Sequence, residues 1–249
     1  MDNYYAIHLT RRKVSFVVLL IDTYTQKPPS KKRVDAFVRG YGQNVIGKED
    51  GSIVFVNMPD EKFEIDILSD EYFTETITVD MKDGNRTTGT NIVKVRLIPN
   101  AEYKLSRGTT FLDCTCAPGT EIHVFPIGCE SSFRVAKQME NSIAIRTISD
   151  TDLSDRLFAF YDGVGPYIFE IGEKIVRNTY MAKLEKQYER SAEIYEVSIG
   201  KADENGRLLC PIRGFSESCR EVFIIINRGE HSSHMKCDIV YGKGNAIIL

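Results

Sequence analysis

Short apolar runs alternate with turn-forming residues along the first third of the chain. Val14–Ile21 is apolar enough for a buried strand, whereas Arg33–Val38 and Phe63–Ile67 alternate polar and apolar residues, as half-buried strands do. Asp50-Gly51 predicts a tight turn, because this dipeptide readily adopts positive φ. Further strands are expected at Ser52–Val56, Tyr72–Val79 and Ile92–Ile98. Strands at this regular spacing predict a β-sandwich or barrel, and we expect an antiparallel sandwich.

The polar, turn-rich stretch Asp83–Asn91 is typical of a long hairpin loop or of a domain boundary. Ile92–Ile98 follows it and could close the first sheet. We therefore place the boundary at Pro99-Asn100, which divides the chain into residues 1–98 and residues 99–249.

The remainder of the chain predicts a second mainly β domain. The expected strands are Phe111–Leu112, Glu121–Ile127, Ser142–Ile148, Leu157–Phe160, Tyr167–Ile171, Tyr195–Ile199, Leu208–Pro211, Val222–Ile226 and Cys237–Tyr241. One candidate helix covers Lys174–Ala192, where Ile175, Tyr180, Leu184 and Tyr188 fall near helical spacing. The fold class expected for the whole chain is thus mainly β.

One short internal sequence similarity, which we call the internal echo, links the two halves of the chain. Glu49-Asp50-Gly51 precedes a strand, a turn and Phe63–Ile67, and Glu204-Asn205-Gly206 precedes a strand, a turn and Glu221–Ile225. Asp-Gly and Asn-Gly hairpin signals are common, so coincidence and a duplicated domain both remain open. The echo hints that the second domain is also a sandwich.

Five segments of the first ~80 residues carry a resemblance to a known family: Val17–Asp22 with Pro28, Val34–Val38, Asp50–Pro59, Phe63–Ile67 and Tyr72–Thr76. Together they resemble the carboxypeptidase regulatory-like family, a transthyretin-like β-sandwich. The family's D-x-x-T-x-x-P start and D-G-x-x-x-F middle are present, whereas Glu71 replaces the usual Gly before Tyr72. The resemblance implies an accessory or structural module. Such a module followed by a second β domain is similar to parts of phage-tail-like assemblies.

Composition supports a folded β protein and gives few hints about partners. The chain has 12 Tyr, 13 Phe and no Trp, with 42% hydrophobic and 27% charged residues. A net charge of −3 gives no electrostatic reason to expect nucleic acid or an anionic membrane as partner. Arg11-Arg12-Lys13 before Val14–Ile21 imitates a signal peptide, but the pattern ends at Asp22 and the run is too short to span a bilayer. We expect a cytoplasmic protein without a membrane span, with release by lysis left open.

The cysteines and histidines are the first candidates for chemistry. Six cysteines occur without a recognisable disulfide framework, and we expect all of them to be reduced thiols. His231, His234 and Cys237 offer three potential metal ligands, but structural zinc needs four. We therefore predict no metal site and no cofactor, and a polar hairpin turn that leads into a strand at Cys237.

Other candidate groups have simpler interpretations. Cys114-Thr115-Cys116 on a strand would direct both thiols to one buried patch, and the alternation around His123 places that ring on the outer, exposed face. The carboxylates Asp60, Glu61, Glu64, Asp66, Asp70 and Glu71 are expected on turns or on the solvent face of a strand. Asp162-Gly163-Val164-Gly165-Pro166 lacks the lysine of a phosphate loop and predicts a turn.

No constellation supplies a nucleophile, a base and an orienting group, so we predict no catalytic residues and no enzyme. The favoured function is a structural or interaction protein that packs with other protein subunits, with homo-oligomers among the alternatives. The second hypothesis is a carbohydrate- or peptide-binding module that uses surface tyrosines such as Tyr41, Tyr161 and Tyr167. The apolar end Ala246–Leu249 is either a last strand of the second domain or a partner-binding tail.

Overall fold

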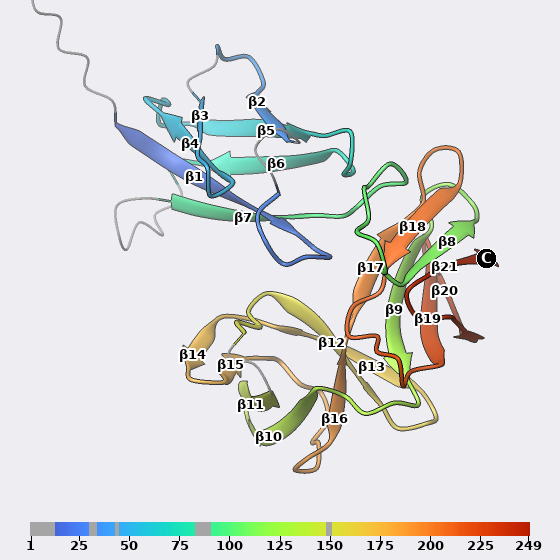
Figure 1. Cartoon of the computed structure of the whole chain (residues 1–249). Helices are drawn as coiled ribbons and strands as arrows, with labels where there is room; N and C mark the ends of the chain where they lie inside the picture. Colours follow the sequence, from blue (N-terminus) through green and yellow to red (C-terminus); the bar gives the residue numbers. More distant parts are fainter. Residues whose placement is uncertain (1–12, 30–33, 43–44, 83–90, 148–150) are drawn as a thin grey trace, which may run out of the picture. The chain divides into compact units, whose positions relative to one another are not determined.

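The computed structural model describes residues 13–29, 34–42, 45–82, 91–147 and 151–249 (Figure 1). The chain divides into two compact units, Met1–Leu97 and Ile98–Leu249, one residue before the division expected from the sequence. The fold is mainly β, as predicted, and the described residues contain strands but no helix. The loop expected at residues 83–91 lies outside the described residues, apart from Asn91.

The described residues of the first unit form seven strands, arranged in the orders β3-β4-β1-β7 and β2-β5-β6. The strands are β1 (Val14–Asp22), β2 (Asp35–Val38), β3 (Val45–Gly47), β4 (Ser52–Val56), β5 (Lys62–Leu68), β6 (Glu75–Asp80) and β7 (Asn91–Leu97). Alternate residues of β1 and β5, such as Phe16, Val18 and Ile65, are fully buried and supply the core. All pairs are antiparallel except β1 and β7, which run parallel from Phe16–Asn91 to Asp22–Leu97.

Asp22 explains why the turn after β1 has its particular sequence. Its carboxylate is buried, accepts hydrogen bonds from the backbone N–H groups of Tyr24 (2.8 Å) and Thr25 (3.2 Å), and accepts a third from the Tyr72 hydroxyl (3.0 Å). A buried carboxylate with several donors stabilises a tight turn without an unsatisfied charge. The D-x-x-T-x-x-P start, which is Asp22, Thr25 and Pro28 here, therefore has a structural role: it stabilises the turn after β1.

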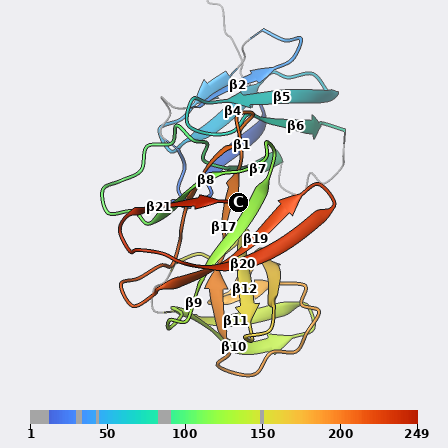
Figure 2. The ribbon, with the colours of Figure 1, turned by 90° about the vertical axis from the view of Figure 1, so that its right-hand side faces the viewer.

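A second sandwich forms part of the second unit (Figures 1 and 2). One sheet has the order β18-β8-β21 and the other the order β17-β9-β19-β20. The strands are β8 (Phe111–Thr115), β9 (Glu121–Ile127), β17 (Ser198–Lys201), β18 (Arg207–Pro211), β19 (Glu221–Arg228), β20 (His231–Asp238) and β21 (Gly244–Ile248). Leu112 and Leu208 from one sheet and Ile122 and Ile224 from the other are buried in one core cluster.

The remaining strands form a closed barrel inserted between β9 and β17. They are β10 (Phe133–Met139), β11 (Ser142–Thr147), β12 (Arg156–Tyr161), β13 (Pro166–Ile171), β14 (Lys174–Val176), β15 (Thr179–Met181) and β16 (Glu193–Glu196). The sheet has the order β13-β12-β16-β10-β11-β15-β14. Its first and last strands, β13 and β14, follow each other in the chain with only Gly172 and Glu173 between them. Gly172 donates to the Met181 carbonyl (2.7 Å) and Met181 donates to the Glu173 carbonyl (2.9 Å), which closes the sheet on itself. Its core includes Val135, Ile143, Phe158, Phe169, Tyr180 and Ile194.

The two sandwiches share the arrangement of six of their seven described strands. Counted along the chain, β1 to β7 of the first sandwich are equivalent to β8, β9, β17, β18, β19, β20 and β21 of the second. In both sandwiches the first strand lies between the fourth (antiparallel) and the seventh (parallel), and the fifth lies between the second and the sixth. The only change concerns the third strand, since β3 pairs with β4 whereas β17 pairs with β9.

The internal echo falls on equivalent turns of the two sandwiches. Before β4, Lys48 donates to the Ser52 carbonyl (2.8 Å) and Gly51 to the Lys48 carbonyl (3.2 Å). Before β18, Asp203 donates to the Arg207 carbonyl (2.9 Å) and Gly206 to the Asp203 carbonyl (3.0 Å). Gly51 and Gly206 have φ values of 79° and 76°, a conformation that favours glycine. The two echo segments thus form the same structure.

The predicted helix at Lys174–Ala192 is wrong. The segment contains β14 and β15, followed by an irregular stretch that leads to β16. Tyr180 and Tyr188 are buried in the barrel core, and Asn178 takes a positive φ of 55° in the turn between β14 and β15. Closure of the barrel therefore overrides a weak helical periodicity.

The C-terminal residues belong to their own sheet. β21 pairs in parallel with β8, and Leu249 donates to the Thr115 carbonyl (3.2 Å). Ile247 and Leu249 pack against the core of the second sandwich, whereas Ile248 is 89% exposed. Ala246–Leu249 is therefore the last strand of the second unit, which was one of the two alternatives left open.

Candidate functional site: the inserted barrel and its neck

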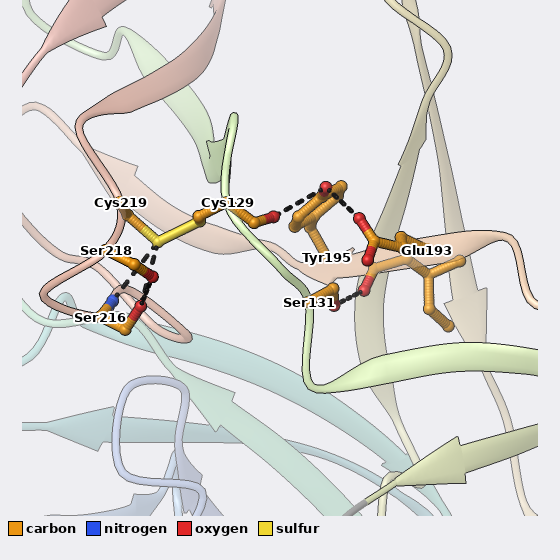
Figure 3. Close-up of a disulfide and its surroundings, with 8 residues drawn as sticks. Cys129, Ser131, Glu193, Tyr195, Ser216, Ser218 and Cys219 are labelled. Carbon is orange, nitrogen blue, oxygen red and sulfur yellow. Dashed lines mark hydrogen bonds between the residues drawn. A yellow bond between two sulfur atoms is a disulfide. The ribbon is translucent and has the colours of Figure 1, made fainter.

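The barrel connects to the second sandwich through two segments that we call the neck. The first is Gly128–Ser132, and the second is the last barrel strand, β16, together with Val197 (Glu193–Val197). Cys129 in the first of these segments forms a disulfide with Cys219, which immediately precedes Arg220 and β19 (Figure 3). Their Cα atoms are 5.0 Å apart, and 90 positions separate them in the sequence. The prediction that all cysteines are reduced is therefore wrong for this pair. No short spacing could reveal it, because the fold alone brings the two thiols together.

Polar contacts join the two neck segments beside the disulfide (Figure 3). The Tyr195 hydroxyl lies 3.2 Å from the Cys129 carbonyl oxygen and 2.9 Å from Glu193 Oε2. Burial and the neighbouring Glu193 carboxylate raise the pKa of Tyr195 to about 12. Ser131 Oγ donates to the Ile194 carbonyl, and Arg134 pairs with Glu193 (2.9 Å). The segments that lead into and out of the barrel are thus tied to each other.

The sandwich side of the disulfide is buried. Cys219 is inaccessible to solvent, and its sulfur accepts a hydrogen bond from the Ser216 backbone N–H (3.5 Å). Ser216 Oγ lies 3.4 Å from the same sulfur and 2.8 Å from Ser218 Oγ (Figure 3). The disulfide therefore anchors the neck to the loop between β18 and β19.

An apolar cluster seats the barrel on the outer face of the sheet β17-β9-β19-β20. Phe125 and Phe223 stack with ring centroids 5.5 Å apart and are both buried. The same cluster contains Ala159 from the barrel and Tyr195 and Val197 from the neck. These aromatic side chains would be solvent-exposed on an isolated sandwich, so the barrel contributes to the stability of the sheet beneath it.

A buried ionic triad lies at the end of β16. Glu196 accepts from Arg156 on β12 (3.1 Å) and from Arg213 in the sandwich (2.7 Å), and all three side chains are nearly inaccessible. One carboxylate between two guanidinium groups would leave buried charge without compensation if it were removed. The triad therefore fixes the barrel to the sandwich through a third kind of interaction, beside the disulfide and the apolar cluster.

His123 differs from its prediction in exposure. Its ring lies on the face of β9 opposite to Ile122 and Val124, as expected, but its side chain is only 19% exposed and lies 3.0 Å from Glu121. The prediction treated this outer face as solvent-facing, whereas the barrel covers part of it. On the neighbouring strand β20, His234 stacks on the covered Phe223 (5.3 Å), and Lys236 lies over the ring of Tyr161 from the barrel (5.3 Å).

The three residues considered and rejected above as metal ligands all lie on β20, which begins at His231 and not at Cys237. The hairpin turn expected over these residues is therefore wrong in extent. His231 and Cys237 have the opposite parity to His234, so the strand directs them to the other face. Among the described residues, no group of three or more His, Cys, Asp or Glu side chains could hold a metal ion.

Cys114 and Cys116 both pack against the sandwich core, as the alternation predicts. Burial raises the pKa of Cys114 to about 12, which disfavours the reactive thiolate. Among the other carboxylates, Glu64 and Asp66 pair with Arg39 at 2.6 and 2.7 Å, and Glu71 is buried, contrary to the turn-surface expectation. The Asp162–Gly165 segment forms the turn of the β12–β13 hairpin, as predicted.

The three candidate surface tyrosines lie in three separate environments. Tyr41 belongs to the first unit, where it meets Phe63 edge-on and donates to Glu61. Tyr161 packs between Phe223 and Lys236, and Tyr167 packs against the barrel core. Tyr161 and Tyr167, both in the second unit, therefore have different neighbours.

Comparisons with known proteins do not assign the chain to a family. No family model and no curated protein matches the chain. Among solved structures, the chain is similar to "The Bacillus anthracis TIE protein", with a TM-score of 0.26, 10% identity, and coverage of 95% of this chain and 50% of that chain. The chain thus spans half the length of that protein. It is also similar to "Anomalous substructure of Titin-A168169", with a TM-score of 0.15, 7% identity, and coverage of 95% and 98%. The described residues contain no helix long and apolar enough to cross a membrane.

Proposed function

We propose that the chain is a non-catalytic interaction protein in which the sandwiches act as a scaffold and the barrel binds another protein subunit. The observation that carries this proposal is the attachment of the barrel. A complete barrel, with its own core, is inserted into a sandwich and held there by a disulfide, an apolar cluster and a buried ionic triad. Attachment through three different interactions suits a domain whose orientation matters to a partner.

The side of the barrel away from the neck carries the proposed contact surface. β12 and β16 contribute to the neck cluster and triad, whereas β11 and β15 lie on the opposite part of the closed sheet. Met139, Ser142 and Met181 form one cross-strand row there. Met139, Met181 and the nearby Ile175 and Val176 are between 37% and 61% exposed. An apolar protein surface is the partner that this chemistry fits, because flexible methionines pack against varied apolar shapes.

The disulfide also bears on where the protein acts. Structural disulfides persist in oxidising compartments and are rare in the cytosol. We therefore propose that the protein functions outside the reducing cytosol, in place of the cytoplasmic location expected from the sequence. Alkylation of free thiols in intact cells, followed by peptide mapping without reduction, should recover the Cys129–Cys219 pair.

The assembly proposal is tested by the mass of the complex in the protein's own cell extract. The native chain should migrate in a complex heavier than the monomer, and a Met181→Asp and Ile175→Asp double variant should lose it. Val164→Asp is the matched control, because Val164 is also apolar and is 91% exposed, but lies on the β12–β13 turn. A native chain that stays monomeric, or a double variant that assembles normally, would contradict the proposal.

A further inference from the structure

We infer that the chain carries mechanical tension between its two ends. Each sandwich acts as a clamp, by which we mean a pair of parallel strands that resists this tension in shear. The disulfide lets the tension bypass the barrel. This inference concerns the path of force through the backbone. It does not depend on what the barrel binds.

The first clamp is the parallel pair β1–β7. The chain enters the first unit at the N-terminal end of β1 and leaves it at the C-terminal end of β7, and their register runs from Phe16–Asn91 to Asp22–Leu97. Because the strands are parallel, these two points lie at opposite ends of the pair. Tension between them slides one strand along the other, so all the hydrogen bonds of the ladder are loaded together.

The second sandwich repeats this geometry. β8 and β21 are parallel, with registers from Phe111–Gly244 to Thr115–Ile248, and the chain enters at the start of β8 and leaves at the end of β21. Leu249 extends the ladder by donating to the Thr115 carbonyl (3.2 Å). Both sandwiches therefore resist an end-to-end pull in shear.

The barrel has the opposite, weaker geometry. Its first and last strands, β10 and β16, are antiparallel neighbours, and Phe133 pairs with Ile194. The two points at which the chain enters and leaves the barrel are thus at the same end of the pair. Tension between them would open the ladder one hydrogen-bonded pair at a time, because only the terminal pair bears the load.

The disulfide removes this weak element from the path of tension. Once β8 and β21 separate, force passes along β9 to Cys129, crosses to Cys219 and continues through β19. The barrel, β17 and β18 all lie within the segment closed by Cys129 and Cys219 and remain slack. The barrel therefore keeps its fold, and any surface it presents, while the sandwich around it extends.

The inference gives specific lengths for single-molecule pulling of the full chain by handles at its two ends. Residues 14–97 of the first unit should lengthen by roughly 26 nm, from ~3.5 Å for each of the 84 residues less a folded span of ~3 nm. In the second unit, 138 residues run from β8 to β21, and subtracting the 90 closed by the disulfide leaves 48. The oxidised second unit should therefore lengthen by roughly 15 nm in one step.

Opening the disulfide should change only the second unit. With a reductant, or in Cys129→Ser, total lengthening should increase by about 31 nm, the length of 90 extended residues, and should include a low-force barrel event. Cys237→Ser is the matched control, because Cys237 is a free thiol of the same unit and should leave the oxidised pattern unchanged. An oxidised native chain that already extends through the barrel would overturn the inference.

The direction of pulling tests the clamp itself. Handles at Thr25 and Glu102 load β1 and β7 from their shared end, where Asp22 pairs with Leu97. The same ladder should then open at a clearly lower force than it does under end-to-end tension. Equal forces in the two directions would overturn the clamp, whatever the outcome of the binding experiment on the barrel.

Discussion

In the first sandwich the short strand β3 extends the sheet of β4, β1 and β7, whereas its counterpart β17 in the second sandwich joins β9. The rest of the strand order is the same in the two units. The barrel is inserted between the second and third strands of its sandwich, and β9 and β17, which flank it, pair from Val124–Ser198 to Glu121–Lys201. An insertion is tolerated where the strands on either side of it can remain neighbours, as β9 and β17 do here.

The largest expected effect concerns the buried triad of the second unit. Glu196→Ala should destabilise the second unit by about 3–5 kcal/mol, because Arg156 and Arg213 lose their shared carboxylate in a buried site. Hydrogen exchange in β19 should report the loss, and exchange in β5 should not change. Arg39→Ala, which breaks an exposed ion pair in the first unit, is the control and should alter neither reading appreciably.

Loss of the disulfide should come next in size. Cys129→Ser should lower the free energy of unfolding of the second unit by about 2–4 kcal/mol, chiefly because the unfolded chain regains the freedom of a long loop. The first unit contains no cysteine and should be insensitive to reductant. Denaturant unfolding, followed with and without reductant, measures the free energy of unfolding of both units. An equal response of the two would show that the disulfide does not stabilise the second unit.

The equivalent turn glycines offer the closest comparison between the sandwiches. Gly51→Ala and Gly206→Ala should each cost about 1–3 kcal/mol, because both positions have positive φ. A Cβ at Gly206 would collide with the backbone carbonyl of Cys116, whereas one at Gly51 would meet the side chain of Pro28. The Gly206 variant should therefore be the less stable of the two in thermal unfolding. The reverse order would show that the close approach of the Cys116 carbonyl does not decide the cost at Gly206.

The smallest effect is electrostatic and belongs to the first unit. Hydrogen bonds from Arg39 and Thr76 hold the pKa of Asp66 below its ordinary value. A depressed folded-state pKa contributes stability that is present above the unfolded-state pKa and is lost as pH falls through the folded-state value. An NMR titration of Asp66 should therefore show its pKa rising in Arg39→Gln. An unchanged pKa would mean that the pair does not persist in solution.

Local patterns predicted many elements of the fold because each depends on a few adjacent residues. The alternation of Phe63–Ile67 and the Asp50-Gly51 turn are of this kind, and both lie where the sequence placed them. The echo at Asn205-Gly206 also coincides with the equivalent turn. β10 was missed because a bulge between Val135 and Lys137 interrupts its alternation.

The candidate site was beyond sequence reasoning for a different reason. Cys129 and Cys219 are brought together only by the complete second unit, and the same holds for Arg156, Glu196 and Arg213. The outer face of β9 was assigned to solvent because nothing local indicates that a barrel covers Phe125. Contacts between distant segments leave no periodic trace in one sequence.

The parallel pairing of β8 with β21 also sets an order of events during synthesis. β8 is the first strand of the second unit to leave the ribosome, and its parallel neighbour β21 is the last strand of that unit to do so, so their sheet cannot be completed until Gly244–Ile248 is available. The barrel, whose strands all lie between these two, can close in the meantime. Partnerships between such distant segments are slow to form, because a long loop must be ordered first. The second sandwich is therefore expected to finish folding around a barrel that is already folded.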